Sequence, residues 1–162
     1  AIILTGNWVR EDGQSKGYSP TDFMTNYGTG DLIAGTYVAE KHLVWGTAPW
    51  SFDETSGVLT IEAGVLSGYA DSPWNRTDEF KVAGPSIKKI VLAGKIVAPV
   101  KSTYLFSSVS SENRLVNVSS ITNLNQLDTS QVTTMSDMFS GVSSVKELDV
   151  SGWNTSQVTS MS

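Results

Sequence analysis

The sequence predicts a mainly β protein whose last third is a solenoid of short repeats. The first observation behind this prediction is an internal repetition: residues 129–136 (TSQVTTMS) return 26 positions later as residues 155–162 (TSQVTSMS), with seven of eight residues identical. A period of this length is typical of solenoids, in which each unit buries its apolar face on the next. The second observation is a stretch rich in β-branched residues, 87–97, bounded by Pro85 and Pro99.

Residues 1–44 form a Gly-rich amino-terminal segment to which the sequence assigns no role. Short strands are compatible with residues 1–5 and 32–38, separated by turn signals at Asp12-Gly13 and Ser19-Pro20. No hydrophobic period extends through this segment, so its membership in the same folded unit stays open.

Residues 45–100 have the pattern of β structure. Residues 57–61 alternate apolar and polar side chains, as a half-buried strand does. Residues 87–97 suit one or two further strands, and no segment in this region has a helical apolar stripe. We therefore expect a β layer ahead of the repeats.

The repeat region has the apolar spacing of a leucine-rich-repeat strand and its approach. Residues 142–150 follow the pattern Val-x-x-Val-x-x-Leu-x-Val, and residues 121–127 match it, with Asp128 and Asp149 at equivalent places. A third copy lies upstream, where residues 105–111 (LFSSVSS) resemble residues 138–144 (MFSGVSS). We expect four further apolar side chains to fill the core rather than form an exposed stripe: Val132, Met135, Met138 and Phe139.

Composition excludes several classes of function. Charged residues make up 17% of the chain and the net charge is -5, which disfavours nucleic-acid binding. The chain has no cysteine, which rules out disulfides, thiolate metal sites and cysteine nucleophiles and favours a cytosolic or Gram-positive surface origin. No apolar stretch has the length of a membrane span. The second copy of the repeat stops at Ser162, so we expect the chain to be a fragment that is truncated inside a repeat.

No motif for catalysis is present. His42 is the only histidine, and no Gly-x-Ser-x-Gly nucleophile motif accompanies it. The adjacent acid pairs Asp53-Glu54 and Asp78-Glu79 would point to opposite faces of a strand, so neither pair can flank one glycosidic bond. We therefore predict a protein that is not an enzyme and that needs neither a cofactor nor a metal.

The repeats resemble those of the BspA-like leucine-rich-repeat surface proteins of bacteria. Residues 148–161 (LDVSGWNTSQVTSM) follow that family's repeat pattern closely, and residues 127–135 (LDTSQVTTM) are a shortened version. A second segment agrees with the stretch that often precedes such repeats, through these positions in order: Trp50, Asp53, Gly57, Leu59, Ile61, Gly64, Pro73, Trp74, Ile87, Ile90 and Val91.

The resemblance implies a division of the chain and a function. Residues 45–104 would form an amino-terminal β cap, and residues 105–162 the first leucine-rich-type repeats, together a leucine-rich-repeat-type solenoid with a β cap. The implied protein is a cell-surface adhesin segment, cell-wall attached or secreted, that binds host glycoprotein, mucin or extracellular matrix protein. Two alternatives stay open: a carbohydrate-binding β module and a structural stalk of a surface protein. The open edge of the last repeat also predicts association between chains.

Two groups of residues are candidates for ligand binding. The strand side of the repeat face is the first, because repeat proteins hold such side chains in fixed rows; its members are Ser143, Ser144, Lys146, Glu147 and Asp149. The second is a cap platform of Trp50 and Trp74, whose rings would stack on sugars, although packing of these rings over the first coil is the favoured interpretation. Trp153 is expected to pack at an edge rather than to bind a ligand.

Overall fold

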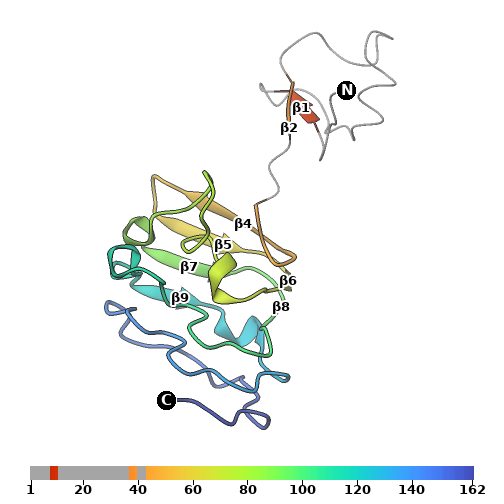
Figure 1. The fold of residues 1–162 in the computed structure, drawn as a ribbon, viewed down its shortest axis with the longest axis vertical. Coiled ribbons are helices and arrows are strands. Elements are labelled where there is room, and N and C mark those ends of the chain that lie inside the picture. Colours follow the sequence, from red (N-terminus) through yellow and green to blue (C-terminus); the bar gives the residue numbers. More distant parts are fainter. Residues whose placement is uncertain (1–7, 11–36, 40–42) are drawn as a thin grey trace. The chain divides into compact units, whose positions relative to one another are not determined.

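The protein is described here from a computed structural model, which places residues 8–10, 37–39 and 43–162 (Figure 1). The chain divides into two compact units, residues 1–42 and 43–162. In the first unit, β1 (Trp8–Arg10) pairs antiparallel with β2 (Tyr37–Ala39). The strand expected over residues 1–5 and the single histidine, His42, lie outside the described residues.

The second unit is built on two sheets. A five-stranded sheet has the order β3-β4-β5-β7-β9, in which β3, β4 and β5 are antiparallel and β5, β7 and β9 are parallel. A three-stranded parallel sheet has the order β10-β8-β6. The strand bounds are β3 Val44–Trp45, β4 Ala48–Asp53, β5 Val58–Ile61, β6 Gly64–Val65, β7 Lys89–Leu92, β8 Ile96–Val97, β9 Ser120–Thr122 and β10 Leu127–Asp128.

The only helices within the described ranges are four short 3₁₀ turns: η1 Tyr69–Asp71, η2 Gly84–Ser86, η3 Ser111–Asn113 and η4 Leu124–Gln126. The prediction of a mainly β protein is therefore confirmed at the level of secondary structure. The strands predicted within residues 57–61 and 87–97 are present as β5, and as β7 with β8. Both β5 and β7 alternate half-buried and buried residues, as the apolar pattern predicted.

The two copies of the repeated sequence pair with each other in space. Isolated parallel bridges join Lys101 to Thr134 and Thr134 to Ser160. Thr133 donates its backbone N–H to Val100 O at 2.8 Å, and Thr159 donates its own to Thr133 O at 2.8 Å. The hydroxyls of these two threonines donate to the same carbonyl oxygens at 3.2 Å. The Thr positions of the repeat thus satisfy backbone carbonyls of the preceding segment.

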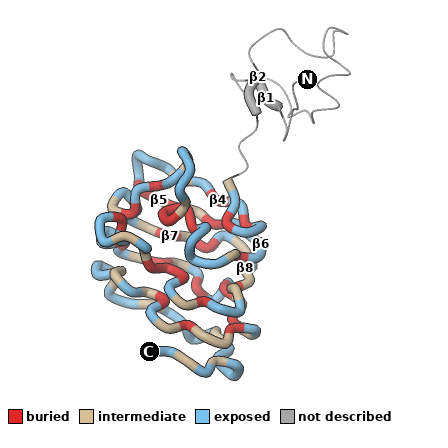
Figure 2. The backbone as a smooth tube through the Cα atoms, viewed as in Figure 1, coloured by how far each residue is buried: buried red, intermediate tan, exposed pale blue. Residues whose placement is uncertain are grey.

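The core of the second unit lies between the two sheets and the segments that are bridged at Lys101, Thr134 and Ser160. Equivalent positions on the three parallel strands are in register, Leu59 with Ile90 and Ile90 with Ile121, and all three side chains are buried. Figure 2 shows buried positions along β5 and β7. The predicted core filling is confirmed for Val132, Met135 and Met138, which are buried. Phe139 is partly buried and packs against the same core.

A column of aromatic rings runs through this core. Trp45 meets Trp74 edge to face at 5.4 Å between ring centroids, and Trp74 stacks on Phe106 at 6.4 Å. Phe106 stacks on Phe139 at 5.4 Å with a 3° interplanar angle, and Phe139 stacks on Trp153 at 6.1 Å. Residues that lie about a hundred positions apart in the sequence are thereby connected through one apolar column. Trp153 packs here as expected.

One predicted strand is absent. Residues 142–150 have the apolar spacing of a repeat strand, but the structure assigns no strand to them. Three of their apolar side chains still turn inward, since Val142, Val145 and Leu148 are partly buried against the core, whereas Val150 is exposed. The segment makes no backbone ladder with β9, which is the last strand of its sheet. Apolar spacing predicts which side chains are buried, whereas strand pairing depends on how closely two segments approach.

Phe106→Ala should destabilise the second unit strongly. The ring is fully buried between Trp74 and Phe139, so its removal leaves a cavity and breaks the column, at a cost of about 3–5 kcal/mol. Urea unfolding followed by tryptophan fluorescence measures this loss. The matched control is Val109→Ala, at a side chain that is 60% exposed, which should stay within about 0.5 kcal/mol of the parent. Equal effects would mean that the column carries no stability.

Candidate functional site

The candidate site is a groove beside the edge strand of the five-stranded sheet. We name it the β9 groove; its volume is about 680 Å³. One wall is residues 119–125, which include β9 and the start of η4, and the other wall is formed by Ser144, Lys146, Glu147 and Asp149. Serine, threonine and asparagine supply most of the side chains of the first wall: Ser119, Ser120, Thr122, Asn123 and Asn125.

Two hydrogen bonds between distant parts of the chain position the second wall. Ser144 Oγ donates to Val116 O at 2.5 Å, just ahead of β9. Trp153 Nε1 donates to Leu124 O at 2.9 Å, just after β9. The chain between Ser144 and Trp153 is therefore attached at both ends. Its middle stands away from β9, and the space between them is the groove.

Four of the five predicted repeat-face residues line this groove. Ser144, Lys146, Glu147 and Asp149 come together there, while Ser143 is exposed and lies outside the lining. Sequence reasoning missed the whole opposite wall. It used Ile121 and Leu124 only as core positions, although the polar residues alternating with them were visible in the sequence. The structure makes these polar residues one side of the same cavity.

The charges of the groove are sparse and mixed, with one lysine and two carboxylates. Asp149 is held by its neighbour: Ser151 Oγ donates to Asp149 Oδ1 at 2.6 Å, and Ser151 N donates to the same oxygen at 3.1 Å. These hydrogen bonds, the hydroxyl one first, lower the pKa of Asp149 below its ordinary value. The ionised form of Asp149, which can only accept hydrogen bonds, is therefore favoured.

The alternative platform of Trp50 and Trp74 does not present free ring faces. Trp74 is completely buried and donates its indole N–H to Ser107 O at 2.8 Å. Trp50 is 5% exposed, and the Arg76 guanidinium lies over its ring at 5.6 Å from the centroid. In this structure both rings serve packing, which is the interpretation the sequence favoured.

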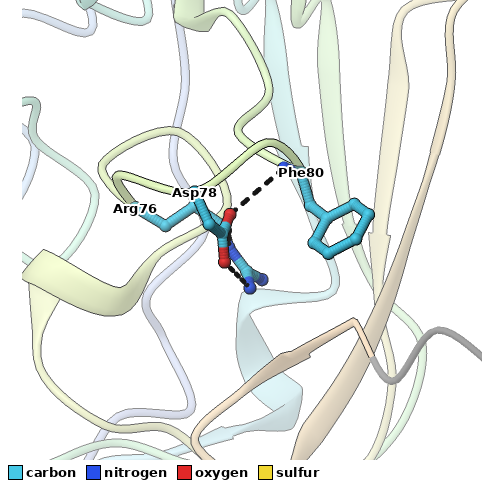
Figure 3. Close-up of polar contacts among 3 residues, drawn as sticks. All are labelled: Arg76, Asp78 and Phe80. Carbon is cyan, nitrogen blue, oxygen red and sulfur yellow. Dashed lines mark hydrogen bonds and ion pairs between the residues drawn. The ribbon is translucent and has the colours of Figure 1, made fainter.

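A second cavity, of about 640 Å³, lies in the predicted cap and holds an ion pair. Arg76 Nε and Nη2 donate to the two carboxylate oxygens of Asp78 at 2.7 and 2.5 Å, and Phe80 N donates to Asp78 Oδ1 at 3.2 Å (Figure 3). The hydrogen bond from Arg76 is the main cause of the lowered pKa of Asp78. The pair closes the turn at residues 76–80 and occupies Nε and Nη2 of Arg76.

Within the described ranges, no group of three or more histidine, cysteine or acidic residues is placed to hold a metal ion. The described part of the chain also contains no helix with the length and apolar character that a membrane crossing needs.

Fold and groove together define a mainly β protein with parallel ladders and a polar groove at a sheet edge. Residues 103–162 match a protein-family model described as "Mycoplasma protein of unknown function, DUF285". The matched residues include β9, the bridged repeats and both walls of the β9 groove. No curated protein and no solved structure matches the chain.

Ser151→Ala should raise the pKa of Asp149 toward its ordinary value. The hydroxyl donates to the ionised carboxylate, and its loss makes protonation easier. Since the folded pKa lies below the unfolded one, this contact stabilises the fold above the unfolded pKa, and its contribution disappears as pH falls through the folded value. A carboxyl-carbon NMR titration measures the shift. Ser156→Ala is the control, because that residue has no contact with Asp149, and an unchanged Asp149 pKa in Ser151→Ala would contradict this assignment.

Proposed function

We propose that residues 45–162 are the cap and first coils of a leucine-rich-repeat-type solenoid, and that the chain is a non-enzymatic adhesin segment of a bacterial surface protein. The resemblance to BspA-like repeats supports the surface location, cell-wall attached or secreted. The partner class is host glycoprotein, mucin or extracellular matrix protein. The ligand meets the β9 groove.

The successive parallel ladders support the solenoid part of this proposal. Equivalent residues of β5, β7 and β9 recur 31 positions apart, as Leu59, Ile90 and Ile121. Two further series of parallel partners follow one another along the chain, Gly64 to Ile96 to Leu127 in the second sheet and Lys101 to Thr134 to Ser160 in the bridged segments, at spacings of 26 to 33 residues. In a solenoid, each turn of the chain passes through positions equivalent to those of the turn before. Three series of parallel partners are consistent with such turns.

The single observation that carries the adhesin part is the polar β9 groove. Uncharged donors and acceptors outnumber the charged side chains in its lining, which suits partners rich in hydroxyl and amide groups. Both walls are attached to the sheet framework, so binding needs little further ordering of the chain. A structural stalk has no need of such a groove. A carbohydrate module built on Trp50 and Trp74 is disfavoured by the burial of both rings.

Binding to mucin and matrix proteins should be weak for one chain and should depend on the groove. Glu147→Ala with Asp149→Ala should weaken the response at immobilised mucin or fibrillar matrix protein in surface plasmon resonance, about two- to tenfold. Glu54→Ala with Glu79→Ala is the matched control, because these exposed residues lie outside the groove. Display of many copies on a bead should raise the apparent affinity about 100-fold or more. Equal losses in both double variants, or no binding even in multivalent form, would refute the proposal.

Added repeats should stabilise the chain. An apolar cavity of about 580 Å³, with Met138, Leu148 and Trp153 in its lining, lies on the face where a following coil would pack. Met161, which also lines it, is 59% exposed. Two further copies of residues 137–162 appended after Ser162 would cover this face and extend the ladder at Ser160. Urea midpoints should rise with each copy. The control appends copies in which the Val, Met, Phe, Leu and Trp positions are Ser; if both extensions act alike, the solenoid proposal fails.

A further inference from the structure

The β9 groove contains an unfinished sheet edge. β9 pairs with β7 on one side and is the last strand in the order of its sheet. In a parallel ladder, alternate residues direct their backbone N–H and C=O groups to opposite neighbours. Among the described residues, no backbone hydrogen bond joins residues 119–125 to residues 144–149. Part of the backbone of β9 therefore faces the groove without a strand partner.

The opposite wall is held back from this edge. Ser144 Oγ fixes one end to Val116 O and Trp153 Nε1 fixes the other to Leu124 O. Proteins usually protect an open strand edge with a charge, a proline or a covering loop. β9 itself has the sequence Ser-Ile-Thr, with neither charge nor proline. The charged residues of the groove, Lys146, Glu147 and Asp149, line the opposite wall and not the β9 edge itself.

We propose that the β9 groove receives an extended polypeptide segment of the partner, which adds to β9 as a sixth strand of the five-stranded sheet. The proposal rests on the adhesin function above and specifies that the recognised element of the partner is a peptide segment. A polypeptide offers donors and acceptors at the spacing of a strand edge, whereas the hydroxyls of a glycan do not repeat at that spacing. The far wall has one cation and two anions, so it favours a neutral or basic segment with small polar side chains.

Hydrogen exchange on the whole chain tests the proposal directly. The probe is an acetylated and amidated octapeptide of alternating Thr and Lys, read by amide exchange NMR. In the free protein, the amide of β9 that faces the groove should exchange rapidly, while the amides of β7 that are bonded within the sheet exchange slowly. Saturating peptide should slow the β9 amide about tenfold or more. If the β9 amides are as protected as those of β7 without peptide, residues 145–149 close the edge themselves and the proposal is wrong.

Backbone methylation separates strand addition from side-chain binding. In one further peptide the backbone nitrogen of every Thr is methylated, and in another that of every Lys. Each modification removes the N–H donors along one edge of the added strand. One methylated peptide should lose binding and the other should keep it. Equal binding of both would overturn strand addition. Glu147→Lys should weaken the unmethylated peptide about two- to fivefold, against no change for Glu112→Lys, which lies outside the groove.

A glycan probe in the same exchange experiment distinguishes failure of this inference from failure of the adhesin proposal. If a neutral mucin-type trisaccharide slows the β9 amide and the peptide does not, the peptide inference fails while the adhesin function stands. If neither probe acts on β9, and mucin and matrix protein still bind in surface plasmon resonance, the peptide inference fails alone. Loss of all binding in both assays refutes the two proposals together.

Discussion

The parallel register between successive segments is the constraint on which the rest of this structure depends. Leu59, Ile90 and Ile121 occupy equivalent ladder positions 31 residues apart, so each new strand brings its apolar residue beside the last one. Parallel pairing cannot be made by a tight hairpin, and the chain must travel around the core between strands. The intervening residues use that path to form β6, β8 and β10 and the later bridges.

Buried amides hold these long connections together. Asn75 donates to Tyr69 O and Ser107 O, both at 2.9 Å, and accepts from Val109 N at 3.0 Å. Asn113 accepts from Gly84 N at 2.6 Å and donates to Trp74 O. Both side chains are nearly inaccessible and satisfy backbone groups of loops that would otherwise be buried without partners. Gly84 permits this approach, since a Cβ there would lie 2.0 Å from Asn113 O. The loops are thus fixed by side chains from other loops.

The same register explains why the groove forms at β9. From β5 to β9 each strand of the five-stranded sheet has a parallel neighbour, and the apolar core and the backbone ladder grow together. After β9 the core continues, through Met135, Met138 and the stacked rings of Phe139 and Trp153, but the sheet does not. Two side-chain hydrogen bonds take the place of the ladder at its ends. The polar residues between those bonds then border a cavity instead of covering a paired strand.

The sequence by itself determined the β character, the burial pattern and the pairing of the repeats. Alternation predicted β5, and β-branched content predicted β7 and β8. The repeated segments 129–136 and 155–162 bridge through Thr134 and Ser160. These features follow from local spacing, because a side chain's face is fixed by its position along an extended chain. Four of the predicted site residues also lie together, since they are close in sequence and on one segment.

Only the tertiary structure decided that residues 142–150 form no strand, that the indole N–H of Trp74 is bonded to Ser107 O, and that residues 119–125 are the second wall of the groove. Each of these depends on a contact between residues some 30 positions apart, such as Ser144 with Val116 or Trp74 with Ser107. Apolar spacing sets which side of a segment faces the core. It does not set how near the neighbouring segment lies, because that distance is fixed by hydrogen bonds and packing from the rest of the fold.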